Sequence, residues 1–442
     1  MAANTMTFAH GVVMEEYKEL SENSSLHTAN IPKLVTIPLT MHIGAPSKCI
    51  VKKKDEVAVG DLIGEAVGNF SANVHSSVAG VVSDIINIQT ASGKNAQAVV
   101  IDTEGFDQNK EYVEKETADL SKEEIVAKIK EAGIVGMGGA AFPAHIKYSP
   151  NKPVDTVIVN GAECEPYITC DDYIMKNRPL HIIKGLIQAV KAVDAKTGII
   201  AIEDNKPKAY KSITETLESF VKENKINFEL RVVSMKTKYP QGDEKRLIDS
   251  ILDRQVPSGG LPMDVGAIVS NISTINAIYE AIYLDKPLYE RIVTVTGQTV
   301  KSPTNMIVRI GTSFGQLIEE AGGASDMAKV VNGGPMCGIA QPDTTRPIEK
   351  ASNCVLVLDS IQAQLPEMQA CIRCGRCVDA CPVMLLPLYI HKFALDERFE
   401  KADEFGALDC IECGSCSFVC PSKRPLVEAI KFAKRQIRQA GK

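Results

Sequence analysis

Short runs of β-branched and other apolar residues, separated by Gly, Pro, Asp and Ser, recur between residues 34 and 101. Such runs are typical of short strands joined by tight turns. The pattern predicts a small all-β module, which we place at 30–107. The runs are VTIPL (35–39), CIVKK (49–53), GVVSDII (80–86) and AVVID (98–102).

This module contains two segments that look like repeats of each other. Residues 50–66 and 74–85 resemble the two halves of a lipoyl-like barrel-sandwich hybrid. Neither of its turns presents a modifiable lysine with the neighbours expected of a carrier domain. We therefore expect a docking domain and not a carrier domain. A lone histidine in a turn, such as His75, is more often structural than a metal ligand.

Strand and helix patterns alternate between residues 120 and 271. The β-rich runs 154–161, 198–204 and 227–235 are separated by amphipathic stretches at 178–193 and 208–224. Alternation of this kind predicts an α/β sheet built from crossover units, expected over 118–262. Ligands of such sheets bind in the loops beyond the strand carboxyl ends, so those loops are the ones to inspect.

Two further units follow. Strand patterns around the helical run SFGQLIEEAGG predict a compact α+β module over 263–345. A cysteine-rich unit, expected over 360–442, ends in a stretch that predicts an amphipathic helix. Residues 422–442 carry seven Lys or Arg and one Glu. A solvated basic face is the plainer interpretation, and contact with a partner or an anionic surface is the alternative.

Composition narrows the class of protein. Hydrophobic residues make up 45% and charged residues 24% of 442, as in ordinary globular proteins. A net charge of -6 and a pI of about 5.8 disfavour a nucleic-acid partner. No apolar run approaches the roughly 20 residues of a membrane span, and the first residues lack a signal-peptide pattern. These features predict a cytosolic protein.

The cysteines carry the strongest chemical signal. Eight of thirteen occur in two tetrads, each with the spacing Cys-x2-Cys-x2-Cys-x3-Cys-Pro. This spacing is typical of paired 4Fe-4S clusters, in which the fourth cysteine of each motif binds the other cluster. The predicted ligand sets are Cys371, Cys374, Cys377 and Cys420 for one cluster, and Cys410, Cys413, Cys416 and Cys381 for the second.

Zinc is the alternative, because Cys-x2-Cys pairs also suit tetrahedral zinc, but zinc needs two pairs and not two tetrads. The other five cysteines lack ligand spacing and are expected to be inert thiols. Among these, Cys164 is the one to watch, because it lies within a loop rich in functional groups.

Three loops of the α/β region are rich in groups that bind phosphate or nucleotide. Glycines in GMGGAAFP (136–143) free several backbone N–H groups to converge on a phosphate, with Lys147 as countercharge. NGAECEPY (160–167) follows a predicted strand, and YPQGDE (239–244) precedes a predicted helix. A plain tight turn would explain the first loop alone, so its weight comes from the other two.

These motifs together resemble the RnfC components of Rnf ion-translocating ferredoxin:NAD oxidoreductases, and the match runs from about 32 to 425. The central loops are also similar to those of the NADH-oxidising flavoprotein subunit of respiratory complex I. The motifs that carry the resemblance are GIVGMGGAAFPAHIK, VNGAECEPYITCDD, YPQGDEKRLI, NGGPMCGIA, CIRCGRCVDACP and CIECGSCSFVCPSKRPL.

The resemblance implies a noncovalent FMN, an NAD(H) site and two 4Fe-4S clusters, so that the α+β module would be a β-grasp-like SLBB module and the last unit a helical two-cluster ferredoxin domain. It implies the other Rnf subunits as partners, both membrane subunits and a ferredoxin-like one, with this chain peripheral on the cytoplasmic face of the inner membrane. Hydride transfer would run between bound cofactors, without a catalytic side chain.

Binding roles are carried over motif by motif. Gly136, Gly138, Gly139 and Lys147 would hold the FMN phosphate and ribityl chain. The rest of the flavin pocket would be lined by Asn160, Glu163, Tyr239, Gly242, Asn271 and Thr274. Phe142 would stack on the nicotinamide nucleotide, while Glu165 and Glu244 would bind its ribose or adenine. The structural alternative is that these carboxylates satisfy loop N–H groups.

The chain departs from the family twice. AHGVVMEEYKEL replaces an N-terminal Gly-Gly-x-His-Pro, and Cys337 stands where Met is usual. Two other functions compete with the Rnf interpretation. A cobalamin reductase of the PduS type would have the barrel-like module after the clusters, and a non-enzymatic ferredoxin-like relay would need neither a glycine-rich loop nor a nucleotide-sized crevice.

Overall fold

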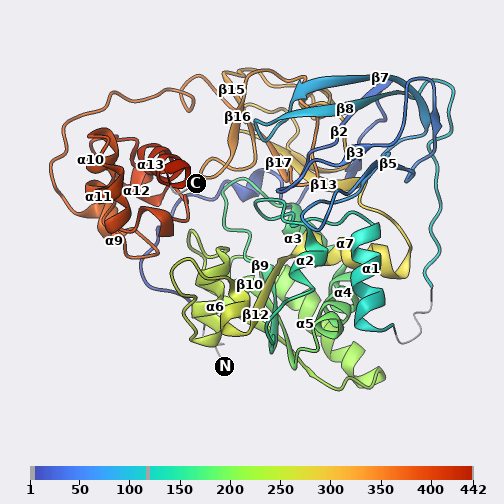
Figure 1. Ribbon diagram of the computed structural model, residues 1–442, viewed down its shortest axis with the longest axis horizontal. Helices are drawn as coiled ribbons and strands as arrows, with labels where there is room; N and C mark the ends of the chain where they lie inside the picture. Colours follow the sequence, from blue (N-terminus) through green and yellow to red (C-terminus); the bar gives the residue numbers. More distant parts are fainter. Residues whose placement is uncertain (1–4, 116–119, 441–442) are drawn as a thin grey trace.

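A parallel four-stranded sheet forms the central unit of the computed structural model, which describes residues 5–115 and 120–440 (Figure 1). The expected domain limits at 118 and 442 lie outside these residues. The strands lie in the order β11-β10-β9-β12. They are β9 (Thr156–Gly161), β10 (Thr197–Glu203), β11 (Glu229–Met235) and β12 (Ala267–Asn271).

Alternate residues of these strands face opposite layers of helices, as the pleat of a sheet requires. Val157 and Val159 pack in the main core with α4 and α7, whereas Ile158 packs in a second core with α6. The helices and turns of this unit are α1 (Lys122–Glu131), α2 (Ala144–Lys147), α3 (Cys170–Asn177), α4 (Pro179–Ala192), α5 (Pro207–Glu223), α6 (Glu244–Leu252), η2 (Pro262–Val265) and α7 (Ile272–Tyr283).

The N-terminal module is all β, as predicted. One sheet has the order β2-β8-β7-β4 and a smaller one the order β3-β5-β6. Figure 1 shows this blue module above the helices of the central unit. Its strands are β2 (Leu34–Pro38), β3 (Lys48–Cys49), β4 (Glu56–Val57), β5 (Leu62–Glu65), β6 (Val74–His75), β7 (Gly80–Gln89) and β8 (Asn95–Asp102).

A six-stranded sheet of order β1-β14-β13-β17-β15-β16 forms the third unit, with helix α8 (Phe314–Glu320) in its core. Its strands are β1 (His27–Thr28), β13 (Glu290–Thr296), β14 (Thr304–Arg309), β15 (Lys329–Asn332), β16 (Ile339–Gln341) and β17 (Cys354–Leu358).

The expected limits of this α+β module need correction. β12 pairs with β9, so the segment from 263 to the end of α7 belongs to the central unit. At the other end β17 extends the module past 345, and β1 joins it from residues that precede the β module. Periodicity identifies a strand but not the sheet in which it pairs, which explains the displaced limits.

The cysteine-rich unit is helical and stands as a separate lobe at the left of Figure 1. Ile390 and Ile430 lie in its small apolar core. The elements are α9 (Arg376–Asp379), α10 (Pro387–Leu395), α11 (Phe399–Glu404), η3 (Ala407–Asp409), α12 (Ser415–Phe418) and α13 (Leu426–Ala440).

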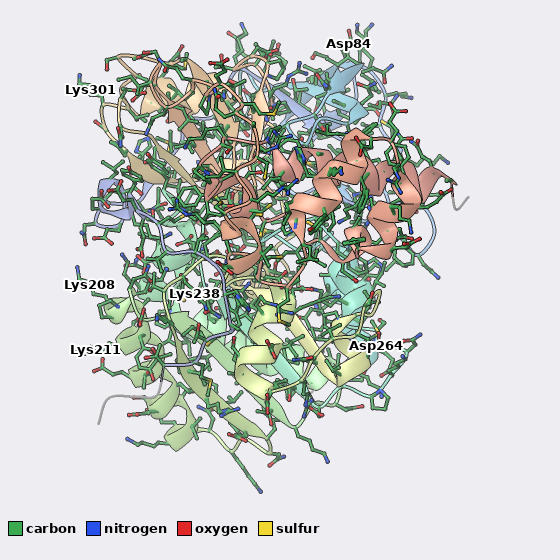
Figure 2. The ribbon with its side chains drawn as sticks, turned by 90° about the vertical axis from the view of Figure 1, so that its left-hand side faces the viewer. Asp84, Lys208, Lys211, Lys238, Asp264 and Lys301 are labelled. Carbon is green, nitrogen blue, oxygen red and sulfur yellow. The ribbon has the colours of Figure 1, made fainter. Side chains whose placement is uncertain are left out.

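The N-terminal segment, defined here as residues 5–24, crosses the central unit and touches the cysteine-rich lobe. The backbones of Val12 and Tyr239 exchange two hydrogen bonds of 2.8 Å. His10 Nδ1 lies 3.0 Å from the carbonyl oxygen of Asp379. Lys238, labelled in Figure 2, donates to the carbonyl oxygens of Phe8 and His10. The segment includes the short turn η1 (Lys18–Leu20).

Within the described parts of the chain, no helix combines the length and apolar character that a membrane crossing requires.

Candidate functional site

The glycine-rich loop lies against the beginning of α7. Met137 N donates to Thr274 Oγ1 at 3.0 Å, and Gly136 N donates to the carbonyl oxygen of Phe142 at 2.8 Å. A Cβ on Gly138 would lie 2.9 Å from that of Asn271, whereas one on Gly139 would meet no atom within 4 Å. The loop therefore needs glycine at 138 for packing and has an open side at 139.

This arrangement suits a phosphate. Asn271 caps α7 by accepting from Ser273 N at 2.8 Å, and the helix continues for 12 residues. A helix N-terminus beside glycine N–H groups attracts anions. Gly136, Gly138, Gly139, Asn271 and Thr274 are thus brought together, and they fit the phosphate end of FMN.

Lys147 and Glu244 meet beside β12, the strand that leads into α7. Lys147 Nζ lies 2.5 Å from Glu244 Oε1 and 2.7 Å from the carbonyl oxygen of Val269. Their side chains are 25% and 43% exposed. A residue expected to bind the flavin phosphate therefore forms an ion pair with one expected to bind the nucleotide.

The loops after β9 and β11 are locked together. Asn160 Nδ2 donates to the carbonyl oxygen of Gly242 at 2.8 Å, while its Oδ1 accepts from Ala162 N at 3.0 Å. Gly242 N lies 3.4 Å from Cys164 Sγ. A Cβ on Gly242 would lie 2.5 Å from the carbonyl oxygen of Ala162, so the approach excludes larger residues. Burial raises the pKa of the Cys164 thiol well above its usual value, as expected of an inert thiol.

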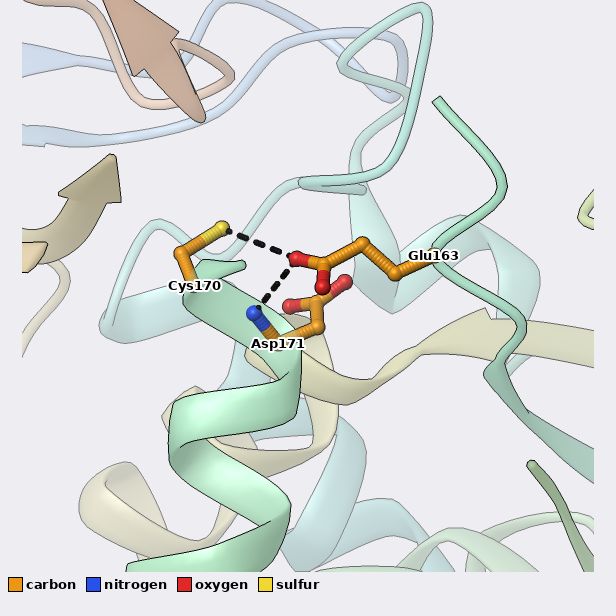
Figure 3. A group of neighbouring side chains, drawn as sticks. All are labelled: Glu163, Cys170 and Asp171. Carbon is orange, nitrogen blue, oxygen red and sulfur yellow. Dashed lines mark hydrogen bonds between the residues drawn. The ribbon is translucent and has the colours of Figure 1, made fainter. Parts of the chain in front are cut away.

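A buried acidic group lies behind these loops (Figure 3). Glu163 Oε1 accepts from Asp171 N at 2.7 Å and lies 3.5 Å from Cys170 Sγ. Asp171 accepts from Asn271 Nδ2 at 2.5 Å and from Ser273 Oγ at 2.7 Å. Burial raises the pKa of Glu163 to about 7, and the nearby ammonium groups of Lys18 and Lys206 oppose this rise.

Glu163, Cys170 and Asp171 have the donor types of a metal site, and their ligand atoms lie within 4.8 Å of one another. Both carboxylates are, however, already engaged by donors of the chain. Burial also raises the pKa of the Cys170 thiol well above its usual value. The group therefore serves to position Asn271 and the 163–171 loop.

Glu165 makes different contacts from those expected. Its Oε1 accepts from Cys337 N at 2.8 Å and its Oε2 from Met336 N at 3.2 Å. A Cβ on Gly334 would lie 2.1 Å from Oε2. Glu165 thus faces the 334–337 loop, and its oxygens satisfy backbone N–H groups instead of lying open to a ribose or adenine.

Two aromatic residues connect the site with neighbouring units. Phe142 is half-buried and packs edge-on against Phe70 of the β module, with ring centroids 5.9 Å apart. Tyr239 is 2% exposed, and its hydroxyl donates to the carbonyl oxygen of Cys413 at 2.8 Å. It also lies 2.9 Å from Cys337 Sγ. Tyr239 therefore extends from the loop after β11 to the cysteine-rich lobe.

The eight motif cysteines line two separate cavities. The first cavity is lined by Cys371, Cys374, Cys377 and Cys420. The second is lined by Cys381, Cys410, Cys413 and Cys416. We call these the outer and inner cluster cavities. Four thiols around one space, with neither histidine nor carboxylate in the lining, match the donor set of a 4Fe-4S cluster.

The inner cavity adjoins the central unit. Arg246 of α6 donates to the carbonyl oxygen of Pro382 at 2.9 Å, in addition to the Tyr239 contact with Cys413. From within the lobe, buried Lys434 donates to the carbonyl oxygen of Cys410 at 2.6 Å. These contacts fix the inner cavity beside the loops of the proposed flavin site.

Sequence reasoning missed several of these residues. Lys18 is buried and donates to the carbonyl oxygens of Glu165 and Ile168, yet its neighbours along the chain carry no signal of this. Arg246 and Phe70 act across units, and Lys434 contacts Cys410 of its own lobe from 24 positions away, which a single sequence does not reveal. Arg246 does fall within the motif YPQGDEKRLI, which was the one available hint.

Four family profiles match the chain in the order of its units. They are the RnfC barrel sandwich hybrid domain (6–106), the Nuo51 FMN-binding domain (129–280), the SLBB domain (292–340) and the 4Fe-4S dicluster domain (364–421).

Curated relatives match nearly the whole chain, and each is the C component of its complex. The one from the Na(+)-translocating ferredoxin:NAD(+) oxidoreductase complex of Acetobacterium woodii is 41% identical, over 98% of this chain and 97% of its own length. Its proton-translocating counterpart from Clostridium ljungdahlii is 40% identical, over 98% and 95%. The one from the ion-translocating oxidoreductase complex of Rhodobacter capsulatus is 35% identical, over 97% and 82%.

Among solved structures, a chain of the NAD(+)-reducing [NiFe]-hydrogenase in its H2-reduced state is similar in fold. The TM-score is 0.53 at 17% identity, over 72% of this chain and 63% of that one. The air-oxidised state of the enzyme gives 0.52 at 17% identity, over 72% and 66%.

Proposed function

The chain belongs to the RnfC family of ion-translocating ferredoxin:NAD(+) oxidoreductase complexes, and from this premise we propose how its residues divide the work. It is an NAD(H)-dependent oxidoreductase subunit that carries FMN and 4Fe-4S clusters in an electron-transferring, ion-translocating complex.

FMN, when bound, supplies the conversion between a hydride, which carries two electrons, and single electrons, which are all that a 4Fe-4S cluster accepts. The chain's own residues bind the two cofactors, orient them and exclude water from them. We assign the phosphate to the glycine-rich loop, the α7 N-terminus and Lys147. The flavin-binding set is Gly136, Gly138, Gly139, Lys147, Asn160, Tyr239, Gly242, Asn271 and Thr274. Glu163, first expected in this set, positions Asn271 through Asp171 instead.

For the nicotinamide nucleotide we keep Phe142 and Glu244. The ion pair between Lys147 and Glu244 suggests a sequence of events at the open edge. A phosphate would draw Lys147 away and free the carboxylate for a ribose hydroxyl. Glu165 is assigned instead to the 334–337 loop, which it holds beside Tyr239.

One observation carries this proposal. Each set of four cysteines predicted from spacing lines its own cavity. Tyr239 of the flavin set donates to the carbonyl oxygen of Cys413, which lines the inner cavity. The places proposed for two-electron and one-electron chemistry are therefore in direct contact.

Composition of the anaerobically purified full chain tests the proposal. We expect about eight iron and eight sulfide per chain, together with one releasable FMN. Cys413→Ser and Cys374→Ser should each remove about half of the iron and leave FMN in place. Zinc in place of iron, or a protein without flavin, would contradict the proposal.

We also propose that the protein lies on the cytoplasmic face of the inner membrane, held by membrane subunits through the β module or the basic end of α13. Lys52 and Lys53 are exposed on the first, and Arg435 and Arg438 on the second. Charge reversal of each pair, followed by co-purification with membranes, tests this. Undiminished co-purification of both variants would contradict it.

A further inference from the structure

The inner cluster cavity has an apolar lining. Besides the four cysteines, the described residues that line it are prolines, a glycine and aliphatic residues, and none of them is charged. The outer cavity, by contrast, is lined in part by Arg373 and Arg424. A 4Fe-4S cluster gains one negative charge when it is reduced, and apolar surroundings disfavour that gain. A cation just outside the inner cavity would therefore favour the reduced state of its cluster.

One cation of the lobe lies beside this cavity, but it is paired. Buried Lys434 donates to the carbonyl oxygen of Cys410 at 2.6 Å. Its Nζ also lies 2.6 Å from Glu412 Oε1. The two side chains together carry no net charge, so Lys434 adds little positive charge beside the cavity.

Arg246 of α6 approaches the same cavity from the central unit. Its Nη1 donates to the carbonyl oxygen of Pro382 at 2.9 Å, and Pro382 is part of the cavity lining. Pro382 directly follows Cys381, one of the four predicted ligands of the inner cluster. The arginine side chain is only 14% exposed. A guanidinium keeps its proton in proteins, so Arg246 places a permanent positive charge against the lining.

The carboxylates near Arg246 offset this charge only in part. Arg246 Nε lies 3.9 Å from Asp243 Oδ1, and Nη1 lies 3.6 Å from Asp249 Oδ2, both beyond hydrogen-bond distance. Asp243 is engaged as the N-cap of α6 and accepts from the backbone N–H groups of Lys245 and Arg246. Among the described residues, the buried Nε of Arg246 has no hydrogen-bond partner. The side chain is therefore held toward the lobe and not toward its acidic neighbours.

We propose that Arg246 raises the reduction potential of the cluster assigned to the inner cavity, and that the central unit thereby sets how readily the lobe accepts electrons from the flavin. This inference rests on the proposed function of that cavity. The potential of a 4Fe-4S cluster depends on the charges and hydrogen bonds around it, and charges act strongly through an apolar medium. Because Arg246 belongs to α6, its effect requires the lobe to be docked on the central unit.

The step that Arg246 favours moves one electron from the reduced flavin to the inner cluster. No bond to Arg246 forms or breaks, and its guanidinium stays protonated throughout. One NADH supplies two such electrons in succession, and its oxidation to NAD(+) releases one proton. Arg246 therefore changes the position of the one-electron equilibrium and leaves hydride transfer unaffected.

Equilibrium redox titration of the FMN- and cluster-loaded full chain, followed by electron paramagnetic resonance, tests this. Arg246→Gln removes the charge and keeps an amide that can donate to Pro382, whereas Arg246→Lys keeps the charge. The matched control is Arg254→Gln, because Arg254 pairs with Asp155 at 2.9 Å, at the opposite end of β9 from the loops of the flavin site. Cys374→Ser, which should lose the outer cluster, identifies the signal of the inner one.

We expect Arg246→Gln to lower the midpoint potential of the inner cluster. At a fixed potential, its ratio of reduced to oxidised cluster should fall about tenfold, which is about 59 mV for a one-electron couple. The outer cluster of the same protein should keep its potential. Arg246→Lys and Arg254→Gln should stay within about twofold of the wild-type ratio, since one keeps the charge and the other removes a distant, screened one. A role confined to holding the lobe in place would change stability or iron content without changing the potential of one cluster alone.

A second variant has an expected effect of opposite sign. Asp249→Asn removes a carboxylate that partly offsets Arg246, so the potential of the inner cluster should rise. An inner-cluster potential that Arg246→Gln leaves unchanged, or lowers no more than that of the outer cluster, would overturn the proposal. If Arg246→Gln does not retain the inner cluster, an unchanged or lowered potential in Asp249→Asn would overturn it. If the wild type shows no reduced-cluster signal at all, the proposed function has failed instead.

Discussion

Glu244 is the residue on which the nucleotide assignment now rests, because Glu165 is engaged with the chain. Glu244→Gln removes the charge and keeps the shape. We expect about a tenfold or greater rise in the dissociation constant for NADH, because a hydrogen bond to a charged group contributes about 1.5–3 kcal/mol. FMN content should be unchanged. Equilibrium titration of NADH binding measures this, with exposed Glu218→Gln of α5 as control. Wild-type NADH affinity in Glu244→Gln would remove Glu244 from the site.

At the residue scale, spacing predicted two sets of cluster ligands, and the structure gathers the cysteines of each set around a separate cavity. Spacing works here because the motif is local and its chemistry is strict. The partner of Tyr239 is not predictable in this way. Its hydroxyl contacts Cys413, 174 positions along the chain, and nothing in either neighbourhood indicates the pairing.

At the scale of elements, the glycine-rich loop and α7 form the proposed phosphate site. Substitutions at two neighbouring glycines of this loop should separate an effect on packing from an effect on FMN binding. Gly138→Ala would place a methyl group against Asn271, and overpacking costs about 1–3 kcal/mol. We expect it to lower the melting temperature of the FMN-free protein. Gly139→Ala meets only open space, so it should keep that melting temperature and reduce FMN retention instead. Equal melting temperatures for the two variants would contradict the loop geometry.

The predicted fold class is confirmed, and the strands at 154–161, 198–204 and 227–235 appear within a few residues of their expected limits. The periodicity of apolar residues does not predict which strands pair with one another. β12 was a correctly expected strand that pairs in the central sheet, and β1 adds two residues to a sheet formed mainly from residues beyond 289. Both pairings depend on contacts between distant parts of the chain.

At the scale of the whole molecule, Lys350 joins three units. Its Nζ donates to the carbonyl oxygens of Asn73 and Gly133, both at 2.6 Å, and the side chain is fully buried. Burial lowers the pKa of Lys350 to about 7 from an ordinary value of 10.5. Between these two values the unfolded chain binds the proton and the folded chain does not, so stability rises with pH across this window.

Lys350→Met removes this titration. We expect the wild type to gain stability relative to the variant as pH rises from about 7 to about 10, and their difference to stay constant below about 7. Melting temperatures of the loaded proteins at several pH values measure this, with exposed Lys122→Met as control. A difference that does not change with pH would show that Lys350 keeps its proton when the protein is folded.

In the whole molecule, electrons from NADH are proposed to enter as a pair at the flavin and to leave singly through the cysteine-rich lobe. Anaerobic stopped-flow mixing of the loaded chain with NADH tests this most directly, with flavin absorbance and rapid-freeze electron paramagnetic resonance as readouts. We predict that flavin bleaching comes first and that reduced-cluster signals follow. Cluster signals that never appear while the flavin bleaches, or a spectrum that NADH leaves unchanged, would contradict it.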